Sequence, residues 1–434
     1  MQGYGQARPR ASAADDPEPA AVADEMRVAS TLPLRLPTLT IPLRMARRHA
    51  FAAISVILAL SATSLTAQSA QFEQRLSAEG VDSSIAPLFA GEPAPRAKYA
   101  VDLHQLLVPT THPSGVTTPV RVQVFVPVAE PHEIRGSYLF APGSTGLINP
   151  CRPSREHEAG IRWGLYRAHV LAFAGQGFVG IIPDYMGFED WDLIQPYFHS
   201  QSEARLVIDV TEAVHGFVSE TLPGGLSGLP RVAAGFSQGG HAAFAAADWN
   251  AEFPAGLELD GVIGYGPTTA VDSLFLEYPS VAPLVIQSYR TIYGDERFDP
   301  YAILMHRWAD QLEYDTTRQC VGGIQSYYPG TPSALFLPEF LGSLRSGTLA
   351  STHPKISRIM EENRAGLSGH GVPALILQGT NDIVVDRRTQ DRFVTALRAS
   401  GSAVRYLVYD GARHDTRQVA FFDAVRWIDE LRNG

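Results

Sequence analysis

The chain has 434 residues, of which 45% are hydrophobic, and a formal net charge of −10 from 45 acidic and 35 basic residues. This length and apolar content suffice for one large domain or two small ones. Because the body of the sequence contains no patch rich in Lys and Arg, nucleic acid is not expected as a partner.

The N-terminal segment, residues 1–44, is rich in Ala, Pro, Arg and Asp and shows little periodicity. Residues 45–70 then have the parts of a secretory signal: a basic start at Met45, an apolar run from Phe51 and small residues up to Ala70. The apolar run is too short for a comfortable membrane span. We therefore expect a secreted or periplasmic protein. Residues 1–44 are either mis-called sequence upstream of a true start at Met45 or a real disordered leader before a membrane anchor.

The next part of the chain alternates strand and helix patterns. Residues 71–98 are polar and rich in proline, which predicts an extended approach to the core. Alternating or continuous apolar runs predict strands at 120–128, 136–143, 178–184, 231–236 and 259–266. Helical spacing of apolar residues predicts helices at 166–176 and 202–222, and an Ala-rich helix follows residue 237.

This rhythm stops at residues 268–372, which contain many aromatic residues but no clear buried-strand run. It resumes with strands at 373–379 and 403–409 and with helices at 389–400 and 418–431. Strands that alternate with helices predict a mostly parallel sheet covered on both faces. The interruption predicts a mainly helical cap over the carboxyl ends of the strands, where open α/β sheets bind ligands; a structural excursion elsewhere is the alternative.

A serine in the middle of the chain has the setting of a nucleophile. Gly235-Phe-Ser237-Gln-Gly239 lies between a predicted strand and an Ala-rich helix, which is the pattern of a nucleophile elbow. Small flanking residues permit the tight turn, and the N–H of Gln238 at the helix start can stabilise a developing oxyanion. The alternative is a loop of small residues with no chemistry.

A serine hydroxyl needs a base, and the base needs an orienting carboxylate. Asp382 directly follows one late strand and His414 follows the next, in the chain order expected of such a triad. Asp386 is an alternative carboxylate farther along its loop. Asp410 and Asp415 flank the histidine and are expected to shape its loop.

Three other groups of polar residues give weaker evidence of a functional role. The loop after the 136–143 strand is expected to supply a second oxyanion N–H, from Gly143 or Ser144. His241 is expected to be a packed or hydrogen-bonded neighbour of the elbow. The run from Glu156 to Glu158 is expected to be a solvated polar loop rather than a metal cluster, because adjacent residues converge poorly on an ion.

The chain has two cysteines, Cys151 and Cys320. In an exported protein they predict one disulfide, which would tie the cap to the oxyanion side of the core. Two buried free thiols are the alternative.

Several of these motifs together resemble the secretory lipase family, the lipase-A-like α/β-hydrolases. They are Gly143-Ser-Thr-Gly with Cys151-Arg-Pro-Ser154, Pro183-Asp-Tyr185 with Gly187, Gly235-Phe-Ser-Gln-Gly-Gly-His241, Gly379-Thr-Asn-Asp382 and the His414 loop. They span roughly residues 100–432. The resemblance implies hydrolysis of carboxylic esters beneath a helical cap, without a cofactor or a metal.

We therefore expect an α/β-hydrolase fold with core segments at 71–267 and 373–434 and a cap at 268–372. The predicted function is that of a secreted serine esterase or lipase, with Ser237, Asp382 and His414 as its triad. Its substrate would be a small-molecule or lipid ester, with transient contact to a lipid surface. The alternatives are a serine peptidase of the same fold and a non-catalytic binding protein on that scaffold.

Overall fold

The computed structural model describes residues 70–161 and 163–433. The predicted leader at 1–44, and all but the last residue of the predicted signal at 45–70, lie outside these residues. No helix in the described ranges has the length and apolar content needed to cross a membrane.

The fold is organised around a nine-stranded mixed sheet in the order β1-β2-β3-β5-β4-β6-β7-β8-β9. From β5 to β9 the neighbouring strands run parallel, whereas β1, β2 and β3 form an antiparallel edge. Strands β4, β5, β7 and β8 are buried throughout, and β6 is buried except at its two end residues, as expected of parallel strands covered on both faces. The strands are β1 (Gln71–Leu76), β2 (Val101–Thr111), β3 (Thr117–Pro127), β4 (Gly136–Ala141), β5 (Phe178–Pro183), β6 (Arg231–Phe236), β7 (Gly261–Tyr265), β8 (Ala374–Gly379) and β9 (Val404–Tyr409).

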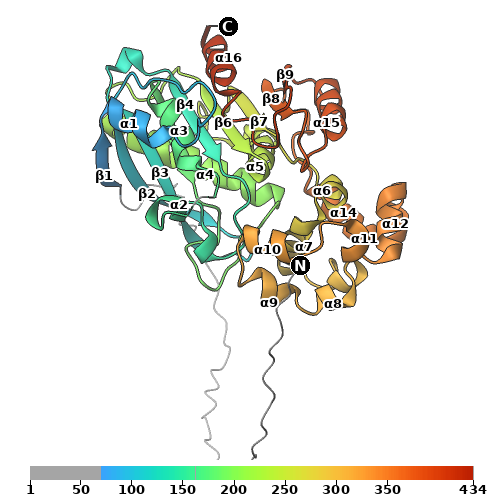
Figure 1. The fold of residues 1–434 in the computed structure, drawn as a ribbon. Coiled ribbons are helices and arrows are strands. Elements are labelled where there is room, and N and C mark those ends of the chain that lie inside the picture. The colour runs from blue at the N-terminus through green and yellow to red at the C-terminus, as the bar shows by residue number, and fades with distance from the viewer. Residues whose placement is uncertain (1–69, 162, 434) are drawn as a thin grey trace, which may run out of the picture. The chain divides into compact units, whose positions relative to one another are not determined.

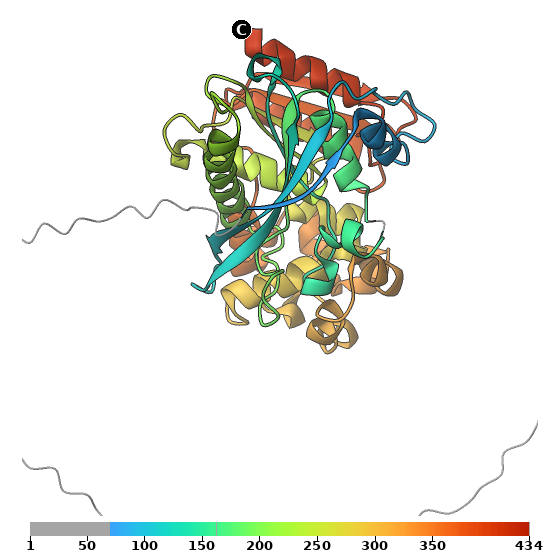
Figure 2. The ribbon, with the colours of Figure 1, turned by 90° about the vertical axis from the view of Figure 1, so that its left-hand side faces the viewer.

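Helices cover both faces of this sheet. One hydrophobic cluster joins the sheet to α4, α5 and α15, and a second joins it to α1, α3 and α16. Figure 2 shows α4 and α1 on opposite sides of the twisted sheet. The helices outside the cap are α1 (Ala78–Ile85), α2 (Arg155–Glu158), α3 (Tyr166–Ala174), α4 (Ser200–Thr221), α5 (Gln238–Asp248), α15 (Arg387–Ala399) and α16 (Phe421–Asn433).

A helical cap is inserted between β7 and β8 and gathers at one end of the sheet (Figure 1). It has its own hydrophobic cluster, which also takes in Leu147, Tyr197 and Phe198 from loops of the core. The cap helices are α6 (Val271–Glu277), α7 (Ala282–Tyr293), α8 (His306–Ala309), α9 (Leu312–Thr316), α10 (Val321–Tyr327), α11 (Pro332–Leu335), α12 (Pro338–Ser346), α13 (Leu349–Thr352) and α14 (Pro354–Glu362).

Short 3₁₀ turns complete the described elements: η1 (Pro131–Glu133), η2 (Asn149–Cys151), η3 (Asn250–Glu252), η4 (Pro279–Val281) and η5 (Pro300–Ala302).

The N-terminal part of the core differs from the sequence-based prediction. Residues 71–98 are not simply extended, because they contain the edge strand β1 and the helix α1, whose Val81 and Ile85 are buried. Strand β2 is not predicted at all, because its alternation of buried residues breaks at Gln105. These elements gain their order from pairing and packing with distant segments rather than from local pattern.

Candidate active site

Ser237 lies at the tight turn between β6 and α5. Its backbone has φ 54° and ψ −114°, and only two other non-glycine residues of the described chain, Leu165 and Phe198, have positive φ. Such a conformation costs of order 1–3 kcal/mol and persists where the surroundings enforce it. Here the Ser237 N–H donates to the Tyr265 carbonyl at 3.1 Å, which ties the turn to β7.

The two glycines of the elbow motif are required by close backbone approach. A Cβ on Gly235 would lie 1.9 Å from the Gly239 carbonyl oxygen, and one on Gly239 would lie 1.8 Å from the Ala141 carbonyl oxygen. The small residues therefore let α5 approach both its own strand and β4.

His414 and Asp382 meet at the same edge of the sheet. Asp382 follows β8, and its Oδ2 accepts a hydrogen bond of 2.8 Å from Nδ1 of His414, which follows β9. The other oxygen, Oδ1, accepts from the N–H groups of Val384 and Val385 at 2.8 and 2.9 Å. Because the carboxylate holds the proton on Nδ1, Nε2 is left as the basic nitrogen. Nε2 is buried and has no hydrogen-bond partner among the described residues.

Ser237 and His414 line one cavity of about 220 Å³ between the core and the cap. The other residues that line it are mostly aromatic or aliphatic: Ser144, Trp163, Tyr166, Tyr197, Phe198, Phe236, Thr268, Leu274, Tyr278, Val281, Val321, Gln325 and Val384. The candidate nucleophile and the candidate base therefore line the same largely apolar cavity.

A larger cavity, of about 520 Å³, lies elsewhere between the core and the cap. It is lined by residues such as His112, Trp191 and Gln287 and contains none of Ser237, Asp382 and His414. Size alone does not identify the reactive site, so we place the candidate chemistry in the smaller cavity, where nucleophile and base converge.

The predicted oxyanion loop lies against the elbow. Strands β4 and β6 are parallel neighbours that pair Ala141 with Gly235, so the loop after β4 leaves the sheet beside Ser237. A Cβ on Gly143 would lie 2.8 Å from atoms of both Phe236 and Tyr166, so this position needs glycine. Ser144 reaches the cavity wall.

Tyrosine hydroxyls fix the conformation of this loop. Tyr185 donates to the Pro142 carbonyl at 2.6 Å, and the Ser144 hydroxyl is 2.5 Å from that of Tyr197. Burial raises the pKa of both tyrosines, so their hydroxyls stay protonated.

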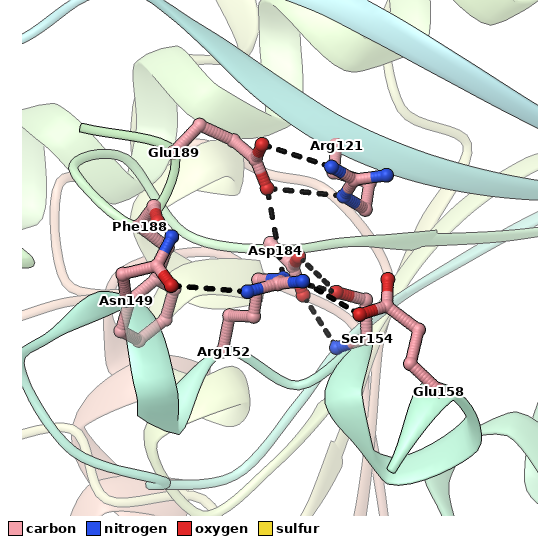
Figure 3. A network of polar contacts seen from close by, with 8 residues as sticks. All are labelled: Arg121, Asn149, Arg152, Ser154, Glu158, Asp184, Phe188 and Glu189. Atoms are coloured by element: carbon pink, nitrogen blue, oxygen red, sulfur yellow. Dashed lines mark hydrogen bonds and ion pairs between the residues drawn. The ribbon is translucent and has the colours of Figure 1, made fainter. Parts of the chain in front are cut away.

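The segment after this loop is anchored by the ionic and hydrogen-bonded network of Figure 3. Asp184, at the end of β5, accepts from both the N–H and the hydroxyl of Ser154, at 2.7 and 2.6 Å. Arg152 donates to Glu158 at 2.6 Å and to Asn149 at 3.1 Å. Burial raises the pKa of Asp184 to about 7 although the Ser154 donors oppose the shift. The network thus holds the turn that carries Cys151.

The predicted disulfide between Cys151 and Cys320 is confirmed, with Cα atoms 5.4 Å apart. The next residue of the cap, Val321, donates its N–H to the Thr145 carbonyl at 2.8 Å. Helix α10, which contributes Val321 and Gln325 to the cavity wall, therefore begins on the oxyanion loop.

The alternative acids have other contacts. Asp386 caps α15 by accepting from the Arg388 N–H, Asp410 accepts from the Thr380 hydroxyl, and Asp415 forms an ion pair with buried Arg417. The hydrogen-bond geometry thus favours Asp382 as the partner of His414.

The 156–158 run is helical, so the predicted loop is wrong, although His157 and Glu158 are exposed to solvent as predicted. It lies in α2, and Glu156 accepts the N–H groups of Gly164, Leu165 and Tyr166 at the start of α3. Three N–H donors at a helix start attract a carboxylate strongly, which explains why this side chain turns inward. In the described part of the chain, no group of His, Cys, Asp and Glu side chains is arranged to hold a metal.

His241 has a more specific environment than the sequence indicates. It is fully buried below the elbow, and its ring nitrogens contact Glu203 and the Asn363 carbonyl. Glu203 was not among the predicted residues; the signal that points to it is an acidic side chain among buried positions near the start of α4.

The parallel sheet with an antiparallel edge, the serine elbow after β6, and the carboxylate and histidine after β8 and β9 define the α/β-hydrolase fold. Solved structures that include an esterase and a lipase share this fold, so the predicted fold is confirmed. The rice cell wall degrading esterase LipA from Xanthomonas oryzae has a TM-score of 0.65 and 19% identity, covering 85% of this chain and 98% of that one.

A Legionella pneumophila protein has a TM-score of 0.67 and 17% identity, over 84% of this chain and 97% of that one. Candida antarctica lipase A in its closed state has a TM-score of 0.62 and 16% identity, over 86% and 83%. No protein-family model matches the sequence, and no curated protein matches it.

Proposed function

We propose that the protein is an exported serine hydrolase of carboxylic esters. The observation that carries this proposal is the convergence of the Ser237 elbow and the His414–Asp382 pair on one apolar cavity. The esterase and lipase named above, which share the fold, support ester bonds as the substrate class.

In the proposed reaction, Ser237 attacks the ester carbonyl while Nε2 of His414 takes its proton. Asp382 holds the imidazole and stabilises the imidazolium that forms. The N–H group of Gln238 and that of Gly143 or Ser144 stabilise the oxyanion, and His414 then protonates the leaving alcohol. Water repeats the sequence on the acyl-enzyme and releases the acid.

The test combines an active-site label with a substrate series. A fluorophosphonate probe should label Ser237, and 4-nitrophenyl esters of increasing acyl length should be hydrolysed. Ser237→Ala should remove labelling and lower the activity by on the order of 10⁴-fold while leaving the fold intact. A folded wild type without labelling would favour the binding-protein alternative. Cleavage of peptides in preference to esters would favour the peptidase.

We also propose export through a signal at 45–70, followed by core segments at 71–267 and 373–434 and a cap at 268–372. The Cys151–Cys320 disulfide supports an oxidising compartment. The mature protein should begin between about residues 65 and 71, because small residues follow the apolar run there. N-terminal sequencing of exported protein tests this, and a start before Met45 would contradict it.

A further inference from the structure

A buried pair of titratable side chains lies beneath the proposed oxyanion residue. Glu203, in the first turn of α4, is 2% exposed, and His241, in α5, is 0% exposed. Nδ1 of His241 lies 2.5 Å from Oε2 of Glu203. Neither side chain lines the cavity that holds Ser237, so the proposed reaction leaves the pair without a role.

The hydrogen-bond partners of His241 favour protonation of its imidazole ring. Nε2 of His241 lies 2.7 Å from the carbonyl oxygen of Asn363, so both ring nitrogens face oxygen acceptors and each needs a proton. Burial would lower the pKa of His241, but the charge of Glu203 and the hydrogen bonds to Glu203 and Asn363 outweigh it and raise that pKa. The raised pKa favours the protonated form of His241, in which both ring nitrogens can donate.

The other oxygen of Glu203 contacts two segments of the candidate site. Oε1 accepts a hydrogen bond of 2.9 Å from Nε2 of Gln238, the residue whose backbone N–H would stabilise the oxyanion. The amide oxygen of Gln238 has no partner within the described residues, so Glu203 is the anchor of that side chain there. Holding the side chain fixes the first residue of α5 next to the strained Ser237.

Oε1 of Glu203 also accepts the N–H of Phe198 at 3.2 Å. Phe198 lines the cavity and has a φ of 55°, a conformation that side chains beyond glycine rarely adopt. The Tyr289 hydroxyl, from the cap, donates to the Phe198 carbonyl at 2.8 Å. One carboxylate thus holds an oxyanion residue and a strained wall of the cavity together.

The network continues into the end of the cap. Asn363 ends α14, and its side-chain oxygen accepts the N–H of Ser200 at the start of α4. Its side-chain nitrogen donates to the Tyr293 hydroxyl at 2.8 Å. His241 therefore joins α5 to the point where the chain leaves the cap.

We propose that Glu203 is a positioning residue for the ester hydrolysis assigned above, with His241 as its hydrogen-bonded partner in the interior. It acts by orienting Gln238 and Phe198, and it does not contact the substrate. This inference rests on the proposed function, since it names a residue that supports the same site.

The experiment compares Glu203→Ala with Glu203→Gln. In the glutamine variant, the amide oxygen can accept from Phe198 and Gln238, and the amide nitrogen can donate to Nδ1 of a neutral His241. Each hydrogen bond of residue 203 therefore keeps a partner, while His241 carries one proton fewer than in the wild type. Glu203→Ala should lower kcat on a 4-nitrophenyl ester by roughly 10- to 100-fold with KM within about threefold, since one oxyanion donor is commonly worth 10²–10³ in kcat. Glu203→Gln should stay within about fivefold of the wild type.

Asp209→Ala is the matched control. Asp209 is another buried acid of α4, but it pairs with Arg205 and accepts from Thr110, away from the elbow. It should lower Tm while leaving kcat per folded molecule unchanged. Should Glu203→Ala not fold, Gln238→Met removes the same contact from the other side and should lower kcat about tenfold at unchanged KM.

The outcomes distinguish a failure of the proposed ester hydrolysis from a failure of the positioning role of Glu203. A wild type that neither hydrolyses esters nor reacts with the fluorophosphonate at Ser237 overturns the proposed function. An active wild type contradicts the positioning role of Glu203 in any of three cases: folded Glu203→Ala or Gln238→Met keeps full kcat, Asp209→Ala loses as much kcat as Glu203→Ala, or Glu203→Gln is as impaired as Glu203→Ala.

Discussion

Removing the disulfide should cost a large part of the stability of the protein. The double variant Cys151→Ala/Cys320→Ala removes a covalent link between positions 169 residues apart in the sequence. For a closed loop of that length, the loss of chain entropy in the unfolded state corresponds to about 5 kcal/mol at 25 °C. Since native proteins are typically stable by only about 5–15 kcal/mol, the change should be easily measured.

The assay is equilibrium unfolding in guanidinium chloride, followed by tryptophan fluorescence. The midpoint should fall and the m-value should rise, because an unlinked unfolded chain is more expanded. Wild type treated with a reductant is the control and should behave like the double variant, because both lack only the link.

The same variant should change activity in a substrate-dependent way. Cys320 precedes Val321, whose N–H bonds to Thr145 and whose side chain lines the cavity. Loosening this start of α10 should alter turnover of long-chain or bulky esters more than that of acetate esters. A loss below about 1 kcal/mol, with unchanged substrate preference, would refute the view that the link restrains both the unfolded chain and the cap.

Three further predictions concern the core of the site. Asp382→Asn should lower kcat by on the order of 10³- to 10⁴-fold by favouring the wrong histidine tautomer. Asp386→Asn, which keeps an N-cap acceptor, should stay near wild type, and the reverse result would show that the carboxylate is misassigned. Tyr185→Phe removes the donor to the Pro142 carbonyl, so it should cost about 1–2 kcal/mol of stability and lower kcat roughly fivefold. An unchanged kcat would show that the oxyanion loop keeps its conformation without this hydrogen bond. Burial raises the pKa of Asp184 from its ordinary value of 3.8 to about 7, so the native state binds an extra proton between these pH values and stability falls as the pH rises across that window. Asp184→Asn should reduce this slope by up to about 1.4 kcal/mol per pH unit in Tm or denaturant titrations, and an unaltered slope would contradict the assignment.

The sequence predicts the parts of the molecule whose signals are local. Continuous apolar runs predict the buried strands because such strands are covered on both faces, and two cysteines in an exported chain predict the disulfide. The placement of Asp382 and His414 directly after neighbouring strands predicts their proximity, since parallel strands end at one edge. Their catalytic roles stay predictions.

The parts that local patterns do not predict depend on long-range contacts. Glu203 looks like any acidic residue in a helix until Gln238 and His241 are packed against it. Tyr185 gains its role only when β5 lies beside β4 and brings its hydroxyl to Pro142. Glu156 turns inward because the start of the next helix, 8 to 10 residues later, presents three N–H groups to it, which the 156–158 run alone does not indicate.

The way the cap is attached limits the movements by which a substrate could enter. The chain passes into the cap and out of it at adjacent places, since the Ala365 N–H bonds to the Thr269 carbonyl at 3.0 Å. If these two adjacent connections were the sole attachment, they would form a single hinge, and the cap could rotate away from the core about it. The link from Cys320 to Cys151 adds a second fixed point. A body held at two points can only rock about the line joining them, so we expect passage to Ser237 to depend on side chains at the rim of the cavity rather than on wide opening.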